Sequence, residues 1–169
     1  MIIWIMGLSG SGKSTLANEV IKEVRKYQSN TLLIDGDEFR NIFNNDLGYT
    51  VDDRKKNASR ISNFCKFCES QNISVVCAIL SIFPEIRDLN KKNLSNYYEV
   101  FIDSPMEDLK QRDGKKLYEN FSKNKIKNVV GLDINFHKPY DADLVIENNR
   151  SLENLLSHVQ LISKKIIKV

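Results

Sequence analysis

The chain has 169 residues, of which 41% are hydrophobic and 28% are charged, and 25 basic residues against 22 acidic ones give a net charge of +3. This composition is typical of one globular domain, here taken as residues 1–169, and the small charge argues against a nucleic-acid polymer as partner. No stretch of 18 apolar residues occurs, so we expect no membrane partner and a cytoplasmic location.

The first predicted element is the apolar run 2–6, which is typical of a buried parallel strand. The sequence GLSGSGKST follows it at 7–15 and has the spacing G-x-x-x-x-G-K-S of a phosphate-binding P-loop. In such a loop, backbone N–H groups surround phosphate, the lysine reaches the β- and γ-phosphates, and the serine hydroxyl binds Mg²⁺. We therefore predict ATP and Mg²⁺ as cofactors, with Lys13 catalytic and Ser14 a metal ligand. The predicted cofactor-binding residues are Gly7, Ser9, Gly10, Ser11, Gly12, Lys13, Ser14 and Thr15.

Strands and helices are predicted to alternate along the rest of the chain. Further strands are expected at 31–34, 74–80, 98–102 and 143–147, and helices at 13–27, 37–44, 53–71, 84–93, 105–111 and 151–167. This order predicts an α/β fold with a parallel five-stranded sheet and helices on both faces. Residues 113–140 are rich in Lys and Asn and lack a strand pattern, so we expect them to form a lid over the phosphates.

Two acidic residues directly follow the second predicted strand. Asp35 and Asp37 should emerge beside the P-loop, because the carboxyl ends of parallel strands share one edge. One carboxylate could accept a proton from an attacking hydroxyl or hold a Mg²⁺-bound water. The alternative interpretation is a D-G turn with Asp37 as the cap of the next helix, and the two interpretations are compatible with each other. We predict both residues to be catalytic and Asp37 to join Ser14 at the metal.

The region after these acids offers groups suited to a second nucleotide. Arg40 lies one helical turn beyond Asp37, and Tyr49, Arg54 and Asn57 follow it. Singly, each is typical of a protein surface. Together they supply guanidinium groups, an aromatic plane and an amide, which can hold a nucleotide.

The three cysteines do not indicate a metal site. Cys65 and Cys68 form C-x-x-C, but no second pair completes a zinc site, and their helical spacing favours core thiols. Cys77 lies in a predicted strand, and we expect no disulfide.

Seven segments occur in an order and spacing that resemble the adenylylsulfate kinases: GLSGSGKST, LIDGDEFR, DLGYTVDDRKKN, FIDSP, QRDGKKLY, IKNVVGLD and ADLVIEN. The resemblance implies a nucleoside-kinase-like P-loop NTPase fold, usually homodimeric, that transfers the γ-phosphate of ATP to the 3′-hydroxyl of a nucleotide with a 5′-phosphosulfate. It places Asp35 and Asp37 beside that hydroxyl and the metal, and Arg112 and Lys127 on the lid side. The substrate-binding residues it implies are Asp35, Arg40, Tyr49, Arg54, Asn57, Ser81, Lys127 and Val129, with Arg112 added to the cofactor set. Ser81 matches a serine of the family that is described as becoming phosphorylated during turnover. A direct in-line transfer needs no such phosphorylated intermediate.

Departures from the family pattern fall on the acceptor side. The usual S-P-Y-R reads SIFP, the usual N-I-R-R reads NASR, an arginine of the lid is Ser122, and the usual G-F-T-G reads NVVG with Val129 in place of phenylalanine. Because fewer basic side chains surround the acceptor, we expect its 5′ group to be less anionic than a phosphosulfate. Because one aromatic ring of the base-binding site is missing, we expect the acceptor to have a smaller base. These changes favour the branch that phosphorylates cytidine 5′-diphosphoramidate, for decoration of surface polysaccharide, with adenylylsulfate as the alternative acceptor.

Three other function classes share some of these features. A switch GTPase would need an N-K-x-D guanine motif, which ENNR at 147–150 does not supply. A non-catalytic binding module predicts lost active-site residues, whereas Lys13, Ser14, Asp35 and Asp37 are present. A kinase for a sugar or a nucleoside monophosphate is the third alternative.

Overall fold

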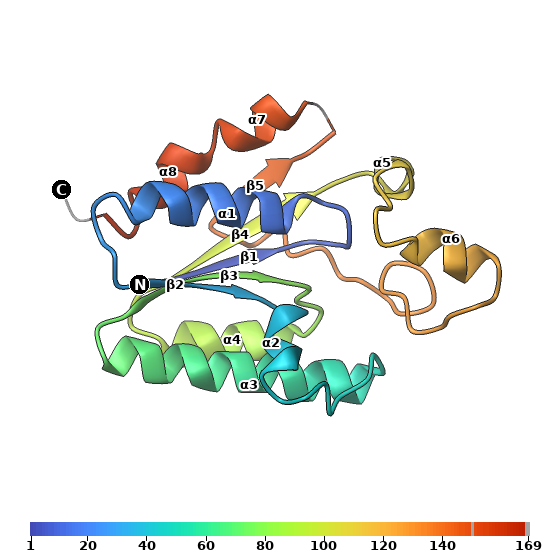
Figure 1. Ribbon diagram of the computed structural model, residues 1–169, viewed down its shortest axis with the longest axis horizontal. Coiled ribbons are helices and arrows are strands. Elements are labelled where there is room, and N and C mark those ends of the chain that lie inside the picture. The colour runs from blue at the N-terminus through green and yellow to red at the C-terminus, as the bar shows by residue number, and fades with distance from the viewer. Residues whose placement is uncertain (150, 168–169) are drawn as a thin grey trace.

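A computed structural model describes residues 1–149 and 151–167 of the chain, and its centre is a five-stranded parallel sheet (Figure 1). The strands are β1 (Ile2–Met6), β2 (Thr31–Asp35), β3 (Ser74–Ile79), β4 (Tyr97–Asp103) and β5 (Leu144–Glu147), in the order β2-β3-β1-β4-β5. All five predicted strands are confirmed with ends within one residue. The central strand β1 is fully buried, as its unbroken apolar sequence predicts for a strand covered on both faces.

Helices cover both faces of the sheet (Figure 1), which confirms the predicted α/β class. On one face lie α1 (Lys13–Val24), α7 (Leu152–Leu156) and α8 (Val159–Ser163), and on the other lie α2 (Glu38–Asn41), α3 (Val51–Ser70) and α4 (Pro84–Asn93). Alternate residues of β1 point to opposite faces, so Ile3 and Ile5 join the core under α1, whereas Ile2, Trp4 and Met6 join the core under α3.

Three predicted helices differ from the structure. The helix expected at 13–27 ends at Val24 and continues only as a turn. The helix expected at 37–44 ends at Asn41, and Asn44 and Asn45 adopt left-handed backbone, which stops its continuation. The helix expected at 151–167 is divided into α7 and α8. Between them the Ser157 hydroxyl donates to the backbone oxygen of Asn154, which His158 Nδ1 also contacts, and such local bonds compete with helical ones.

The segment 113–140 extends beyond the carboxyl ends of the strands, as expected of a lid (Figure 1). It follows α5 (Met106–Gln111) and contains a helix that the sequence analysis did not predict, α6 (Leu117–Ser122). Asp113 fixes the start of α6, because its carboxylate accepts hydrogen bonds from the backbone N–H groups of residues 117, 118 and 119 at 2.7–3.0 Å. A small core beneath the lid contains Leu8, Leu109, Tyr118, Val129 and Val130. The P-loop and the lid therefore share buried contacts.

Within the described part of the chain, no helix combines the length and hydropathy that crossing a membrane requires. Cys65, Cys68 and Cys77 are all buried free thiols, as expected of core cysteines.

Candidate active site

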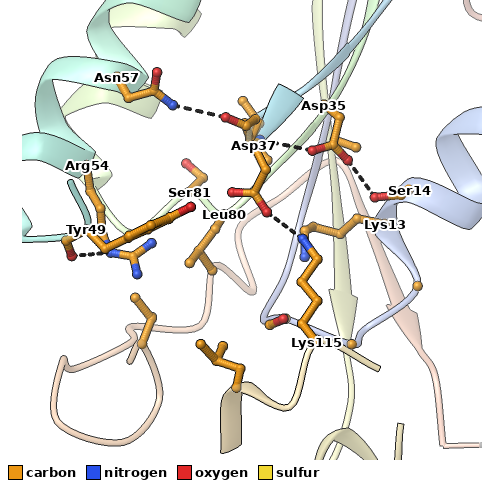
Figure 2. Close-up of a pocket in the computed structure, with 18 of the residues that line it drawn as sticks. Lys13, Ser14, Asp35, Asp37, Tyr49, Arg54, Asn57, Leu80, Ser81 and Lys115 are labelled. Carbon is orange, nitrogen blue, oxygen red and sulfur yellow. Dashed lines mark hydrogen bonds and ion pairs between the residues drawn. The ribbon is translucent and has the colours of Figure 1, made fainter. Parts of the chain in front are cut away.

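A cavity of about 970 Å³ lies at the edge formed by the carboxyl ends of the strands. Its wall includes the P-loop, the end of β2, the first half of α3 and the lid (Figure 2). These are the places where the sequence analysis put both nucleotides.

The P-loop half of the cavity is built from main chain. Gly10 and Gly12 have φ of 79° and 97°, which glycine adopts without strain, and Gly12 directly precedes α1. The first N–H groups of a helix have no partner inside it, so they are free to bind an anion. Two side chains from distant segments fix the loop: Tyr118 OH donates to the Ser9 backbone oxygen at 2.9 Å, and Asn148 Nδ2 donates to that of Ser11 at 2.9 Å.

Lys13 is the first residue of α1, and its side chain contacts the P-loop. Its Nζ donates to the backbone oxygen of Leu8 at 2.7 Å. Burial lowers the pKa of Lys13 to about 8, and the nearby carboxylates of Asp35 and Asp37 oppose this shift. Bound phosphate would add negative charge beside this amine and favour its ammonium form.

The two acids after β2 have different neighbours (Figure 2). Asp35 is half-buried: its Oδ2 accepts from Ser14 Oγ at 2.6 Å, and its Oδ1 accepts from the Asp37 N–H at 2.9 Å. Asp37 is exposed and forms an ion pair of 2.5 Å with Lys115 of the lid, which raises the pKa of Lys115. The sequence analysis paired Ser14 with Asp37 at the metal. In the structure the hydroxyl of Ser14 is hydrogen-bonded to Asp35, the last residue of β2, and the pairing of Ser14 with Asp37 at the metal stays a prediction.

The donor atoms around Ser14 fit a magnesium ion. The hydroxyl of Ser14 and the carboxylate of Asp35 place hard oxygen atoms 2.6 Å apart beside the P-loop, and Asp37 offers a further carboxylate nearby. Groups of three or more His, Cys, Asp or Glu that could form a complete protein cage are absent from the described residues. Mg²⁺ usually takes one or two carboxylates together with water and phosphate.

The opposite half of the cavity contains an aromatic ring with two guanidinium groups. The Tyr49 ring is 53% exposed, and the guanidinium carbons of Arg40 and Arg54 lie 4.9 and 5.3 Å from its centre. Arg40 is buried and donates to the Gly48 backbone oxygen at 2.9 Å. Arg54 donates through Nε to the backbone oxygen of Tyr49 and through Nη2 to the backbone oxygen of Asn128, both at 2.9 Å. The two arginines therefore fix the position of Tyr49, and its exposed part is accessible to a ligand in the cavity.

The floor between the two halves carries polar atoms without partners. Asn57 Nδ2 donates to the Gly36 oxygen at 3.3 Å, but the buried Asn57 Oδ1 and Trp4 Nε1 have no hydrogen-bond partner among the described residues. Ser81 is buried beside them on the cavity wall. Buried polar groups of this kind indicate a place for water or a polar part of a ligand.

One predicted substrate residue lies elsewhere. Val129, expected opposite Tyr49, is 1% exposed and packs in the core beneath the lid, whereas its neighbour Val130 lines the cavity. The reason is local: Asp133 accepts from the Val129 N–H and holds this residue inward. Gly7 and Ser11, which were predicted to bind the cofactor, belong to the P-loop but do not line the cavity.

The remaining predicted residues all line the cavity: Ser9, Gly10, Gly12, Lys13, Ser14, Thr15, Asp35, Asp37, Arg40, Tyr49, Arg54, Asn57, Ser81, Arg112 and Lys127. Sequence reasoning did not assign site roles to several others: Lys115, Leu80, Asn120, Ile126, Asn128, Val130, Asn148, Leu152 and Leu155. Lys115 had a signal, since it belongs to the lysine cluster of the predicted lid. The apolar ones had none, because a leucine or valine looks the same in a core and in a cavity wall.

Comparison with known proteins gives the family. The model of the adenylylsulphate kinase family matches residues 1–147. A cytidine diphosphoramidate kinase of Campylobacter jejuni is 43% identical over 98% of this chain and 95% of its own length. An adenylyl-sulfate kinase of Lactiplantibacillus plantarum is 34% identical over 89% of this chain and 73% of its own length.

Solved structures agree with these matches. The APS kinase of Mycobacterium tuberculosis, in complex with AMPPNP and APS, superimposes with a TM-score of 0.84 at 29% identity, covering 98% of this chain and 96% of its own. The fold, the P-loop cavity and the full-length similarity lead to one conclusion. The chain belongs to the adenylylsulphate kinase family of ATP-dependent phosphotransferases.

Proposed function

We propose that this protein transfers the γ-phosphate of ATP to the 3′-hydroxyl of cytidine 5′-diphosphoramidate. The observation that carries the proposal is the 43% identity to the Campylobacter cytidine diphosphoramidate kinase over nearly the whole of both chains. Adenylyl-sulfate kinases from six other bacteria are 32–36% identical. The cavity supports the same choice through its acceptor half.

The acceptor half suits a small base. Tyr49 supplies an aromatic face, and the lid offers the aliphatic side chains of Ile126 and Val130 to the same cavity. The guanidinium groups of Arg40 and Arg54 keep their positive charge while donating to backbone oxygens, and both acceptors carry anionic 5′ groups that this charge would attract. The single aromatic face with aliphatic partners therefore supports a pyrimidine, and the 5′ group does not distinguish the acceptors.

The donor half explains how transfer would proceed. The P-loop N–H groups would hold the phosphates, and Lys13 would exchange its bond to the Leu8 oxygen for one to phosphate. Lys115, on the lid, lies close enough to Asp37 to bring a second cation over the same phosphates. Lid closure excludes water, which would otherwise take the phosphoryl group in place of the acceptor.

The two acids then divide the remaining work. Asp35 and Ser14 would hold Mg²⁺, which supplies charge neutralisation at the β- and γ-phosphates when bound. Asp37, exposed and on the side of the lid, would orient the 3′-hydroxyl and receive its proton late in the transfer. This exchanges the roles that the sequence alone gave to Asp35 and Asp37.

Adenylylsulfate is the second candidate acceptor. It is favoured by the similarity to the Mycobacterium APS kinase, whose structure contains APS, and by the number of adenylyl-sulfate kinases among the relatives. The catalytic half is the same for both acceptors, so only acceptor kinetics distinguish them.

A panel of acceptors tests the proposal. Purified protein with Mg-ATP would be given cytidine 5′-diphosphoramidate, CDP, adenylylsulfate and ADP, and products would be identified by mass spectrometry with 3′-phosphate mapping. We expect kcat/KM for cytidine 5′-diphosphoramidate to exceed that for adenylylsulfate at least about tenfold, the equivalent of 1.4 kcal/mol. A higher kcat/KM for adenylylsulfate would refute the proposal. The Lys13→Met variant serves as the inactive control.

We also propose that the protein is a cytoplasmic homodimer, on the basis of the family. Light scattering coupled to gel filtration, giving twice the mass of one chain, is the test of the dimer.

A further inference from the structure

Asn128, in the lid loop after α6, combines left-handed backbone with a place on the cavity wall. Its φ is 64°, in the left-handed region. Asn44, Asn45, Asn72, Lys116 and Asn124 share such a backbone, so the conformation by itself is common in this chain. Of these six among the described residues, Asn128 is the one that lines the cavity.

The main chain of Asn128 is fixed at both polar groups. Its N–H donates to Asp133 Oδ2 at 2.7 Å, and its backbone oxygen accepts from Arg54 Nη2 at 2.9 Å. The same guanidinium lies over the Tyr49 ring and donates to the Tyr49 oxygen. One arginine therefore sets the distance between Asn128 on the lid and the aromatic ring on the opposite wall.

The side-chain amide of Asn128 has unused hydrogen-bonding capacity. It is half-buried, yet it forms no hydrogen bond with residues 1–149 or 151–167. A ligand that covers this amide removes its water, which is costly unless the ligand supplies partners. An amide has a donor and an acceptor side by side, and so does the edge of cytosine, where the ring N3 accepts and the 4-amino group donates.

We propose that Asn128 is a specificity-determining residue that hydrogen-bonds the amino-bearing edge of the acceptor's pyrimidine while Tyr49 stacks on its face. The inference rests on the proposed cytidine acceptor and adds the residue that selects it. Adenine offers the same acceptor–donor pair at its N1 and 6-amino group, so the preference for cytosine rests on ring size. The lid and Tyr49, which Arg54 joins, would leave room beside Asn128 for one ring and not for two.

Three variants test the proposal. Asn128→Gly removes the amide and accepts the left-handed backbone without strain. Asn128→Asp keeps the size but removes the donor. Asn124→Gly is the matched control, since Asn124 has φ of 54° in the same lid but is exposed and off the cavity wall. For each, kcat/KM would be measured with cytidine 5′-diphosphoramidate and with adenylylsulfate at saturating ATP, together with KM for ATP.

We expect Asn128→Gly and Asn128→Asp to lose about tenfold or more of kcat/KM for the cytidine acceptor, the usual scale for a paired base contact. Asn128→Gly should hold or raise kcat/KM for adenylylsulfate, and KM for ATP should stay within twofold in both. Asn124→Gly should change neither acceptor. If the wild type prefers the cytidine acceptor but its preference is the same in Asn128→Gly, the inference fails and the proposed function stands. If the wild type prefers adenylylsulfate, both fail.

Discussion

The two halves of the cavity are held in place by different kinds of contact. The donor half consists of backbone N–H groups, and buried partners from the far end of the sheet and from the lid fix it: Asn148 holds Ser11, and Tyr118 holds Ser9. The acceptor half consists of side chains, and a single guanidinium, that of Arg54, joins its two walls.

This difference explains what each half can recognise. Backbone amides bind any phosphate chain, so the donor half needs only the glycine spacing and its anchors. Side chains carry the identity of the acceptor, and a change of one residue can change that identity without affecting the fold. The two halves should therefore respond separately to mutation.

Lys13→Met should have the largest effect. Removing the cation that meets the transferring phosphoryl group should lower kcat about 10³-fold with any acceptor, within the range for such charges in phosphoryl transfer. The melting temperature should stay within about 3 °C, because Lys13 makes one bond, to the Leu8 oxygen. Lys22→Met, on an exposed face of the same helix, is the control. Appreciable turnover by Lys13→Met would contradict the assignment.

Tyr49→Ala should affect only the acceptor half. Loss of base stacking is worth about 1–3 kcal/mol, so kcat/KM for the acceptor should fall about 10- to 100-fold. KM for ATP should remain unchanged, because Tyr49 contacts the acceptor wall alone. Tyr27→Ala, at an exposed tyrosine off the cavity, should match the wild type. An equal rise in KM for ATP would show that the halves are coupled.

The sequence predicted the sheet and the donor half well, for physical reasons. Buried parallel strands have unbroken apolar runs, and the glycines and Lys13 of a P-loop have a fixed spacing along one continuous segment. The acceptor half was predicted only in part, because it depends on where the lid folds. The substitution at Val129 was visible in the sequence, but the hydrogen bond from its N–H to Asp133, which turns Val130 to the cavity, was not.

The pairing of the two acids shows the same limit. Their place after β2 was predictable, but the choice of Asp35 as partner of Ser14 depends on the angle at which the chain leaves the strand. The α6 helix was missed because its start depends on the Asp113 cap and not on apolar periodicity. The lid 113–140 as a separate moving unit, the homodimer and the cytoplasmic location stay predictions.

Tyr118→Phe should have a moderate effect, on the link between the lid and the donor half. The variant loses the hydrogen bond to the Ser9 oxygen, worth about 1 kcal/mol, and the melting temperature should fall by about 3 °C. Burial raises the pKa of Tyr118 to about 12, so the hydroxyl donates at all ordinary pH values.

In that variant kcat should fall about fivefold, within the modest scale of one neutral hydrogen bond, because the P-loop is less well fixed. Tyr140→Phe is a matched control, since the Tyr140 hydroxyl also makes one bond, to Asp103 at 2.8 Å, and lies off the cavity. It should leave kcat unchanged. A change in acceptor preference in Tyr118→Phe would indicate that the contact between Tyr118 and Ser9 affects the acceptor half of the cavity.

Proton uptake on binding Mg-ADP should be the smallest effect. The pKa of Lys13 is about 8 in the free protein because burial disfavours the ammonium, and bound phosphate should raise it. At pH 8.5, above this pKa, most Lys13 side chains are neutral, so binding should take up most of one proton per site, against almost none at pH 6.5. Lys115 does not contribute, because Asp37 raises its pKa.

Calorimetry in two buffers of different ionisation enthalpy measures this uptake directly. The sign is fixed: affinity for Mg-ADP must weaken as pH rises above 8, because the free protein increasingly holds a neutral amine that binding has to protonate. In Lys13→Met the uptake should vanish even where weaker binding is measurable. Equal proton balance at pH 6.5 and 8.5 in the wild type would mean that Lys13 stays charged in the free loop, and that the P-loop carries its positive charge before any phosphate arrives.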